Sequence, residues 1–160
     1  LMENQAYDHV VFSYHGLPER HIKNGSVGNQ CQLSTCCNVL TEKNRYCYRA
    51  QCFYTSRELA KRLGLKDGGY TTTFQSRLGK DPWIKPYTDE VLEGLPEKGI
   101  KKVLVYSPAF ISDCLETTIE VGEEFKESFL EAGGEVWDLV PSLNDSETWI
   151  ECLEDLVKTA

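Results

Sequence analysis

The chain has 160 residues, of which 41% are hydrophobic and 26% charged, as expected for one globular domain whose core needs no disulfides. It has no apolar run long enough to span a bilayer and no signal-peptide pattern at residues 1–20, so the expected compartment is the cytoplasm. The net charge of −8 is the sum of a basic half, residues 1–88, and a strongly acidic half, residues 89–160. This distribution argues against nucleic acid as a partner and favours a side of the protein that attracts cations.

The first half of the chain begins with an apolar run at residues 9–14, which predicts a strand, and His15 lies in the loop that follows it. Residues 20–42 lack periodicity and are expected to form an irregular insertion. Near-helical spacing of apolar residues predicts a helix over 43–63. A β-rich run at 70–75 predicts a second strand, and a loop containing Trp83 follows it.

The second half continues the alternation of helices and strands. It predicts helices at 87–98, 114–132 and 146–158 and strands at 102–106 and 135–140. The predicted fold class is therefore α/β: a four-stranded parallel sheet flanked by helices, Rossmann-like, with right-handed crossovers. No Gly-rich phosphate loop follows any predicted strand, which disfavours nucleotide binding.

The loops after the first three strands are expected to share one sheet edge and form one candidate site. They carry His15, then Gln75, Ser76, Arg77 and Trp83, then Asp113 and Glu116. His15 could accept a proton or ligate a metal, or it could be an ordinary hydrogen-bonded loop residue. Trp83 could stack on a flat ligand or anchor its loop against the core.

The helix predicted at 114–132 has an acidic face and an apolar face. At about 100° per residue, the acidic face contains Asp113, Glu116, Glu120, Glu124, Glu127 and Glu131. One interpretation is a solvated face that starts with Asp113 as N-cap and Glu116 closing a capping box. The other is a cation site, because the acids have few basic neighbours to compensate their repulsion.

Five cysteines lie close together in the sequence, with the spacing C-x4-C-C-x9-C-x4-C: Cys31, Cys36, Cys37, Cys47 and Cys52. In a reducing compartment such crowding indicates a metal before disulfides, although the spacing matches no standard zinc or ferredoxin pattern. Four ligands suffice, and either Cys36 or Cys37 is expected to be spare because adjacent side chains cannot easily point the same way. Metal should order this segment.

Three motifs resemble, in order and spacing, those of the C-terminal half of ferrochelatase. They are Phe-Ser-Tyr-His-Gly-Leu-Pro at 12–18, Phe-Gln-Ser-Arg at 74–77 with Asp-Pro-Trp at 81–83, and Pro-Ala-Phe-Ile-Ser-Asp at 108–113 with Glu-Thr at 116–117. The resemblance implies insertion of ferrous iron into a porphyrin, in haem biosynthesis. It implies that His15 and Glu116 are catalytic, that Tyr14, Gln75, Ser76 and Trp83 bind substrate, and that His15, Asp113, Glu116, Glu120 and Glu124 handle the metal.

The resemblance also carries expectations about partners and cofactors. Residues 1–160 would be a single C-terminal chelatase lobe with a Cys-rich insert at about 22–55, inactive without the N-terminal lobe that closes over the porphyrin. Some ferrochelatases hold a two-iron, two-sulfur cluster on four cysteines, which the insert resembles; zinc and free thiols are the alternatives. An apolar product such as haem makes peripheral membrane contact reasonable.

Other interpretations remain at this stage. A related chelatase acting on a cobalt or sirohaem precursor would have the same architecture. A metal-cluster binding or redox-sensing module would make the cysteine insert the function and the acidic helix merely solvated. Cys114 stands where many ferrochelatases carry histidine, as a softer metal ligand or as a small buried side chain.

Overall fold

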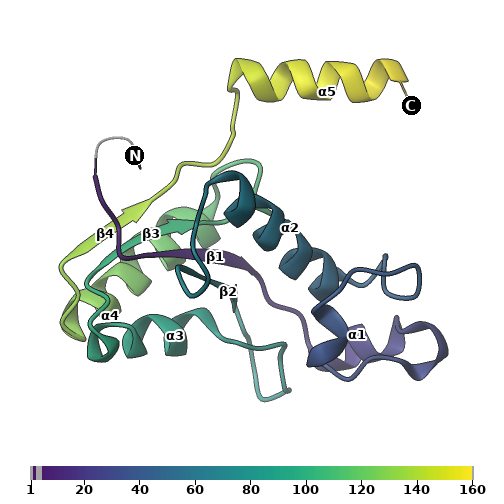
Figure 1. The fold of residues 1–160 in the computed structure, drawn as a ribbon, viewed down its shortest axis with the longest axis horizontal. Helices are drawn as coiled ribbons and strands as arrows, with labels where there is room; N and C mark the ends of the chain where they lie inside the picture. Colours follow the sequence, from purple (N-terminus) through teal and green to yellow (C-terminus); the bar gives the residue numbers. More distant parts are fainter. Residues whose placement is uncertain (1, 3–4, 160) are drawn as a thin grey trace.

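The structure, a computed structural model, describes all residues except 1, 3, 4 and 160 (Figure 1). One parallel sheet forms its centre, in the order β2-β1-β3-β4. The strands are β1 (His9–His15), β2 (Tyr70–Gln75), β3 (Lys102–Tyr106) and β4 (Val136–Leu139). The predicted α/β fold class, with four parallel strands, is confirmed.

Helical segments connect these strands. The α-helices are α1 (Glu19–Asn24), α2 (Tyr48–Arg62), α3 (Thr88–Gly94), α4 (Phe125–Glu131) and α5 (Glu147–Thr159). A nine-residue π-helix, Glu116–Glu124, runs directly into α4, and short 3-10 turns lie at Val27–Asn29, Thr35–Cys37 and Pro96–Lys98.

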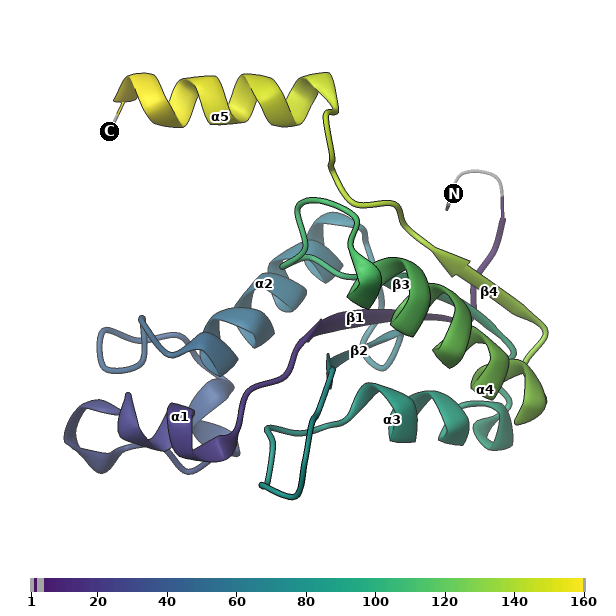
Figure 2. The ribbon, with the colours of Figure 1, turned by 180° about the vertical axis from the view of Figure 1, so that it is seen from behind.

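Two apolar clusters pack on opposite faces of the sheet because side chains alternate along each strand. On one face Phe12 packs with Cys52 and Ala60 of α2. On the other face Val11 packs with Leu92 of α3 and with Phe129 of α4. Figures 1 and 2 show these helices around the sheet from two sides. The result is a three-layer arrangement with β1 and β3 at its centre.

Several predicted helical segments differ from the structure; the helix expected over 87–98 ends at Gly94 and is followed by a separate 3-10 turn at Pro96–Lys98. The helix expected from residue 43 begins at Tyr48, because the Asn44 side chain holds the preceding loop: its Oδ1 accepts from the Thr41 N–H (2.6 Å) and its Nδ2 donates to the Cys36 carbonyl (2.7 Å). The segment 20–42, expected to be irregular, contains α1 and two 3-10 turns. The helix expected over 114–132 begins at Glu116 and is π for nine residues.

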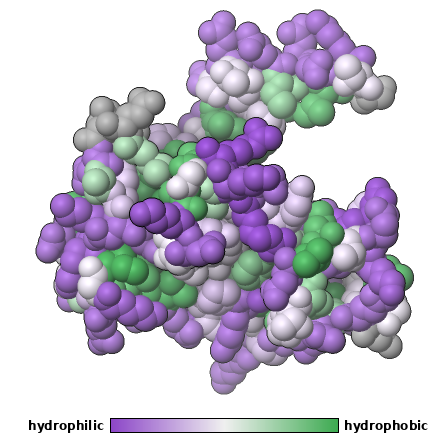
Figure 3. Space-filling model, in the orientation of Figure 1, coloured by the Kyte–Doolittle hydropathy of each residue, from purple (hydrophilic) through white to green (hydrophobic). Residues whose placement is uncertain are grey.

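Helix α5 projects away from the rest of the chain (Figure 1). None of its residues is buried, and its exposed apolar side chains form one stripe at helical spacing: Ile150, Leu153, Leu156 and Val157. Figure 3 shows polar residues along the upper side of this helix and apolar residues below. None of the helices in the described part of the chain combines the length and the apolar character needed to cross a membrane.

Gly134, between α4 and β4, is required by the core. A methyl group at this position would overlap the ring of Phe129, which is fully buried and packs on Trp137 with the ring centroids 5.6 Å apart. We expect Gly134→Ala to lower the free energy of unfolding by about 1–3 kcal/mol through overpacking. Urea titration followed by circular dichroism measures this change.

Gly94, the last residue of α3, is the matched control because a methyl group there meets nothing within 4 Å. Gly94→Ala should leave stability unchanged or raise it by up to about 1 kcal/mol. Equal midpoints for the two variants would contradict the proposed overlap at Gly134.

Candidate functional site

The carboxyl ends of β1, β2 and β3 form one edge of the sheet. The chain passes from β1 outward to β2 and then back across β1 to β3, so the strand order reverses between β1 and β3. In open α/β sheets, ligands bind at such a reversal point, outside the carboxyl ends of the strands. His15 ends β1 there, opposite Gln75 at the end of β2.

His15 lies between two aromatic rings. Its ring centroid is 6.4 Å from that of Trp83 and 6.3 Å from that of Phe110. The Nδ1 atom is 2.6 Å from the Gly16 carbonyl, and the His15 carbonyl accepts a 2.8 Å hydrogen bond from the Tyr48 hydroxyl. The imidazole is therefore fixed at its Nδ1 side and flanked by flat apolar surfaces.

The loop that carries Trp83 packs directly on the loop after β1. Pro18 and Trp83 form an isolated antiparallel bridge, and the Ile84 N–H donates to the Leu17 carbonyl (3.0 Å). Gly16 allows this approach, because a Cβ there would lie 2.8 Å from the Gln75 carbonyl oxygen and 3.1 Å from the Trp83 ring. Trp83 is thus both anchored to its neighbours and half-exposed at the rim.

A row of carboxylates faces this edge from the π-helix. Glu116, Glu120 and Glu124 line one shallow groove together with Leu115 and Ile119. The spacing of four residues that suggested an acidic face in the sequence does bring these three side chains together.

Glu120 is the most firmly held of the three acids. Its carboxylate accepts hydrogen bonds from the Ser76 backbone N–H (2.7 Å), from the Ser76 hydroxyl and, at 3.5 Å, from Gln75 Nε2. Ser76 adopts a left-handed conformation with φ of 64°, which is uncommon for a residue other than glycine. This strained turn directs both of its donors toward the carboxylate.

Gln75, expected to bind substrate, is 2% exposed and instead joins the strands to the π-helix. Its Oε1 accepts from the Ser13 hydroxyl (2.7 Å), and its Nε2 donates to the Glu116 carbonyl (3.0 Å). Both ends of the amide are therefore occupied by protein groups. Gln75 positions the acidic groove rather than lining the rim.

Glu116 lies beside Cys114 and His15. A hydrogen bond with the Cys114 side chain is the main cause that lowers the pKa of Glu116, and the charge of His15 lowers it further. The carboxylate therefore stays ionised and senses His15 electrostatically. Cys114, whose role the sequence left open, donates its backbone N–H to Thr117 Oγ1 (2.9 Å) at the start of the π-helix.

Asp113 is separated from the carboxylate row and does not cap the helix. Its carboxylate accepts from the Asn144 side chain (2.8 Å) and from the Ser142 N–H (3.1 Å), and these bonds lower its pKa. The capping-box interpretation is therefore wrong: Asp113 holds the loop after β4 against the π-helix.

Tyr14, expected to bind substrate, lies on the opposite face of β1 from Ser13. It is 3% exposed, its hydroxyl is 3.1 Å from Ser56 Oγ on α2, and burial raises its pKa. Side chains alternate along a strand, so Tyr14 faces the core under α2 and does not reach the rim.

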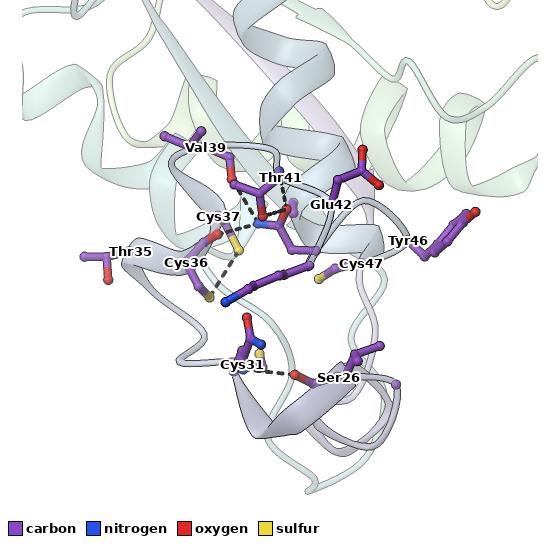
Figure 4. Close-up of a pocket in the computed structure, with 16 residues that line it drawn as sticks. Ser26, Cys31, Thr35, Cys36, Cys37, Val39, Thr41, Glu42, Tyr46 and Cys47 are labelled. Atoms are coloured by element: carbon purple, nitrogen blue, oxygen red, sulfur yellow. Dashed lines mark hydrogen bonds between the residues drawn. The ribbon is translucent and has the colours of Figure 1, made fainter.

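Four of the five clustered cysteines line one cavity of about 330 Å³ in the insert: Cys31, Cys36, Cys37 and Cys47. Figure 4 shows their sulfur atoms around the same space, with Cys36 and Cys37 Sγ 3.9 Å apart. Cys52 does not line the cavity and is 3% exposed in the core, where burial raises its pKa to about 12. Cys36 and Cys37, one of which was expected to be spare, both line the cavity.

The surroundings of the Cys47 thiol lower its pKa. A hydrogen bond from Cys37 is the main cause that lowers the pKa of Cys47 to about 6; burial opposes the shift, while the Ala50 and Arg49 N–H groups and the Arg49 charge favour it. The same hydrogen bond raises the pKa of Cys37. Cys47 is the N-cap residue of α2, and the positive end of the helix dipole there favours a thiolate.

Neither the acidic groove nor the cysteine cavity forms a closed coordination shell. Within the residues that the structure describes, no group of three or more His, Cys, Asp or Glu side chains is arranged to hold a metal ion. The thiols and carboxylates line their cavities without converging on one point.

Two residues at the start of α2 hold the loops that carry His15 and Trp83, and no sequence motif pointed to them. Tyr48 reaches the His15 carbonyl, and Arg49, which is 7% exposed, donates from Nη2 to the Lys85 carbonyl (2.9 Å). The sequence shows only an arginine within the insert, and its importance becomes visible only when its burial is known.

Comparison with known proteins gives a consistent family. The whole chain, residues 1–160, matches the family model described as Ferrochelatase. It is 50% identical over 149 residues to the ferrochelatase of Legionella pneumophila (strain Lens), covering 93% of this chain and 44% of that protein. It is 48% identical over 159 residues to the ferrochelatase of Pseudomonas fluorescens (strain SBW25), covering 98% and 47%.

The chain therefore spans somewhat less than half the length of these relatives. Among solved structures, it is similar to a protein described as a cobalamin (vitamin B12) biosynthesis CbiX protein from Marinobacter aquaeolei VT8, with a TM-score of 0.49 and 13% identity over 94% of this chain and 93% of that one. Because the family model matches the whole chain, the chain belongs to the ferrochelatase family.

Proposed function

We propose that this chain is the C-terminal lobe of a ferrochelatase, which inserts ferrous iron into a porphyrin when the other lobe is present. The observation that carries the proposal is the position of His15. It lies near the rings of Trp83 and Phe110 at the strand-reversal edge, paired with Gln75, whose Nε2 donates to the carbonyl of Glu116 at the head of the acidic groove (3.0 Å).

The chemistry of metal insertion suits these groups. Two pyrrole N–H protons must leave the macrocycle, and a dication must shed water as it reaches the ring. His15 would accept protons on one side, and Glu116, Glu120 and Glu124 would offer carboxylate oxygens to the iron along the groove. Trp83 would stack on the flat substrate.

Asp113, Gln75 and Ser76 would act by positioning. Gln75 and Ser76 hold the Glu120 carboxylate, and Asp113 holds the loop at Ser142 and Asn144. The proposed metal-handling residues are therefore His15 and the three glutamates, with Asp113 outside the path.

The test is metal insertion by the full-length protein. Under anaerobic conditions, we expect it to convert a free porphyrin to its ferrous complex, followed by the change in visible absorption, and residues 1–160 alone to be inactive. Preference for cobalt, or for a sirohaem precursor, would instead indicate a related chelatase. Absence of insertion with every metal and tetrapyrrole offered would refute the proposal.

We also propose that Cys31, Cys36, Cys37 and Cys47 hold a two-iron, two-sulfur cluster. Four thiols that line one cavity match the ligand number of such a cluster, and the lowered pKa of Cys47 matches the required ligand chemistry. When bound, the cluster supplies a one-electron redox centre. Thiols spread around a cavity suit this wider group better than a single zinc ion, which needs its ligands at one point.

A further inference from the structure

The face of the sheet under α3 contains a connected group of buried polar side chains. Each is exposed by 2% or less, and they come from β1, β2 and the first residue of α3: Ser13, Thr73, Gln75 and Thr88. Val11 of β1 and Leu92 of α3 belong to the apolar cluster of the same face. Polar groups at such depth are stable only when they are hydrogen-bonded, so the partners of each one are informative.

Hydrogen bonds join three of these side chains, Thr73, Thr88 and Ser13, into a buried hydroxyl chain. Thr88 donates to Thr73 Oγ1 (2.9 Å), and its oxygen lies 3.0 Å from Ser13 Oγ. Ser13 in turn donates to Gln75 Oε1 (2.7 Å). On its other side Gln75 reaches the π-helix, where its Nε2 donates to the Glu116 carbonyl (3.0 Å). The buried hydroxyl chain is therefore connected through one amide to the head of the acidic groove.

The chemistry of its neighbours fixes the orientation of the Gln75 amide. Its Nε2 faces the carbonyl of Glu116 and the carboxylate of Glu120, and both groups can only accept hydrogen bonds. The amide oxygen therefore faces Ser13, and because this oxygen also only accepts, Ser13 must donate to it. Removal of the Ser13 hydroxyl would leave a buried amide oxygen without its donor, which favours rotation of the amide away from this position.

Two carboxylates of the groove depend on this amide. The backbone of Glu116 is held by Gln75 directly. Glu120 accepts from Gln75 Nε2 at 3.5 Å and from the backbone N–H of the adjacent residue, Ser76, at 2.7 Å. A metal ion needs its ligands held within about 0.5 Å of the productive geometry. Groups that orient such ligands from behind typically change metal affinity by about 10- to 100-fold when they are removed.

We infer that Ser13 and Thr88 are positioning residues for the acidic groove: by orienting the Gln75 amide they hold the start of the π-helix and so set the affinity of the groove for ferrous iron. The inference rests on the proposed function, because that function assigns the groove to iron. His15 is held by separate contacts, with the Gly16 carbonyl and the Tyr48 hydroxyl. Loss of the buried hydroxyl chain should therefore weaken iron binding and leave proton transfer at His15 almost unchanged.

The test is the kinetics of metal insertion by the full-length protein under anaerobic conditions, with the concentration of ferrous iron varied. Ser13→Ala should raise the KM for iron by about 10-fold or more, while kcat and the pH profile of kcat stay close to those of the unaltered protein. Ser56→Ala is the matched control. Ser56 is an equally buried serine on α2, but its hydroxyl lies 3.1 Å from that of Tyr14 on the opposite face of the sheet, so the KM should not change.

Thr88 offers two variants that separate hydrogen bonding from packing. Thr88→Val keeps the shape of the side chain but loses the hydroxyl, and should raise the KM for iron about fivefold, as expected for the loss of one hydrogen bond. Thr88→Ser keeps the hydroxyl but loses a methyl group, and should keep the KM of the unaltered protein. The reverse order would show that Thr88 acts through packing, and would overturn the inference. If Ser13→Ala does not fold, this pair decides the question.

Hydrogen exchange of the Ser76 amide gives a readout that does not depend on metal insertion. This amide donates to Glu120, so it should exchange faster in Ser13→Ala and Thr88→Val than in the unaltered protein and in Ser56→Ala. An unchanged KM for iron in both hydroxyl-deleted variants would overturn the inference, whether or not exchange is faster. Unaltered full-length protein that inserts no metal would instead refute the proposed function, and the inference with it.

Discussion

Replacing His15 by alanine in the full-length protein is expected to slow iron insertion by about 100-fold or more, the range lost when a positioned general base is removed. The porphyrin should still bind, because Trp83 and Phe110, whose ring centroids lie 6.4 and 6.3 Å from that of His15, remain in place. Initial rates of metalloporphyrin formation and porphyrin fluorescence quenching separate the two effects.

Glu116→Gln tests the opposite side of the proposed reaction. The substitution preserves the size of the side chain but removes a carboxylate that its surroundings keep ionised. We expect it to slow insertion to a similar degree. His21→Ala, at an exposed position on α1, is the control and should leave the rate unchanged. Normal insertion by both His15→Ala and Glu116→Gln would exclude the proposed site.

Cys47→Ala is expected to abolish the iron-sulfur centre, whereas Cys52→Ala should retain it. The reason is their placement: Cys47 lines the cavity as the N-cap of α2, and Cys52 lies away from it in the core. Loss of the buried sulfur of Cys52 should lower the free energy of unfolding by about 1 kcal/mol without changing the metal content. Visible absorption, iron content and the electron paramagnetic resonance signal after reduction, all on anaerobically purified full-length protein, measure the difference.

Two results would change this assignment. Loss of the centre in Cys52→Ala with its retention in Cys36→Ala or Cys37→Ala would restore the ligand set expected from the sequence. Colourless protein that contains zinc, or no metal, would refute the iron-sulfur proposal itself.

Local patterns were enough to predict the sheet. The strands expected at 70–75 and 102–106 coincide with β2 and β3, because burial on both faces leaves a continuous apolar or β-branched signature. The position of Tyr14 could also have been predicted, since strict alternation from Phe12 places it on the core face.

Long-range contacts account for most of what was missed. Asp113 is satisfied by Asn144, 31 residues away, and Glu120 by Ser76, 44 residues away, so neither role leaves a local pattern. The π-helix was missed because the sequence analysis assumed the α-helical rotation of 100° per residue, and a π-helix has a wider turn. Adjacency predicted that Cys36 or Cys37 is spare, and this stays a prediction; a 3-10 turn lets both residues line the same cavity.

The exposed position of α5 divides the chain into two levels of stability. A 13-residue helix with no buried residue has little support in water beyond its own hydrogen bonds. Amide hydrogens of Glu147–Thr159 should therefore exchange through local unwinding at almost no free-energy cost, whereas those of β1 and β3 should exchange only through global unfolding. An unfolding free energy measured on these 160 residues alone reports on the sheet and its two covering layers, and α5 contributes nothing to it.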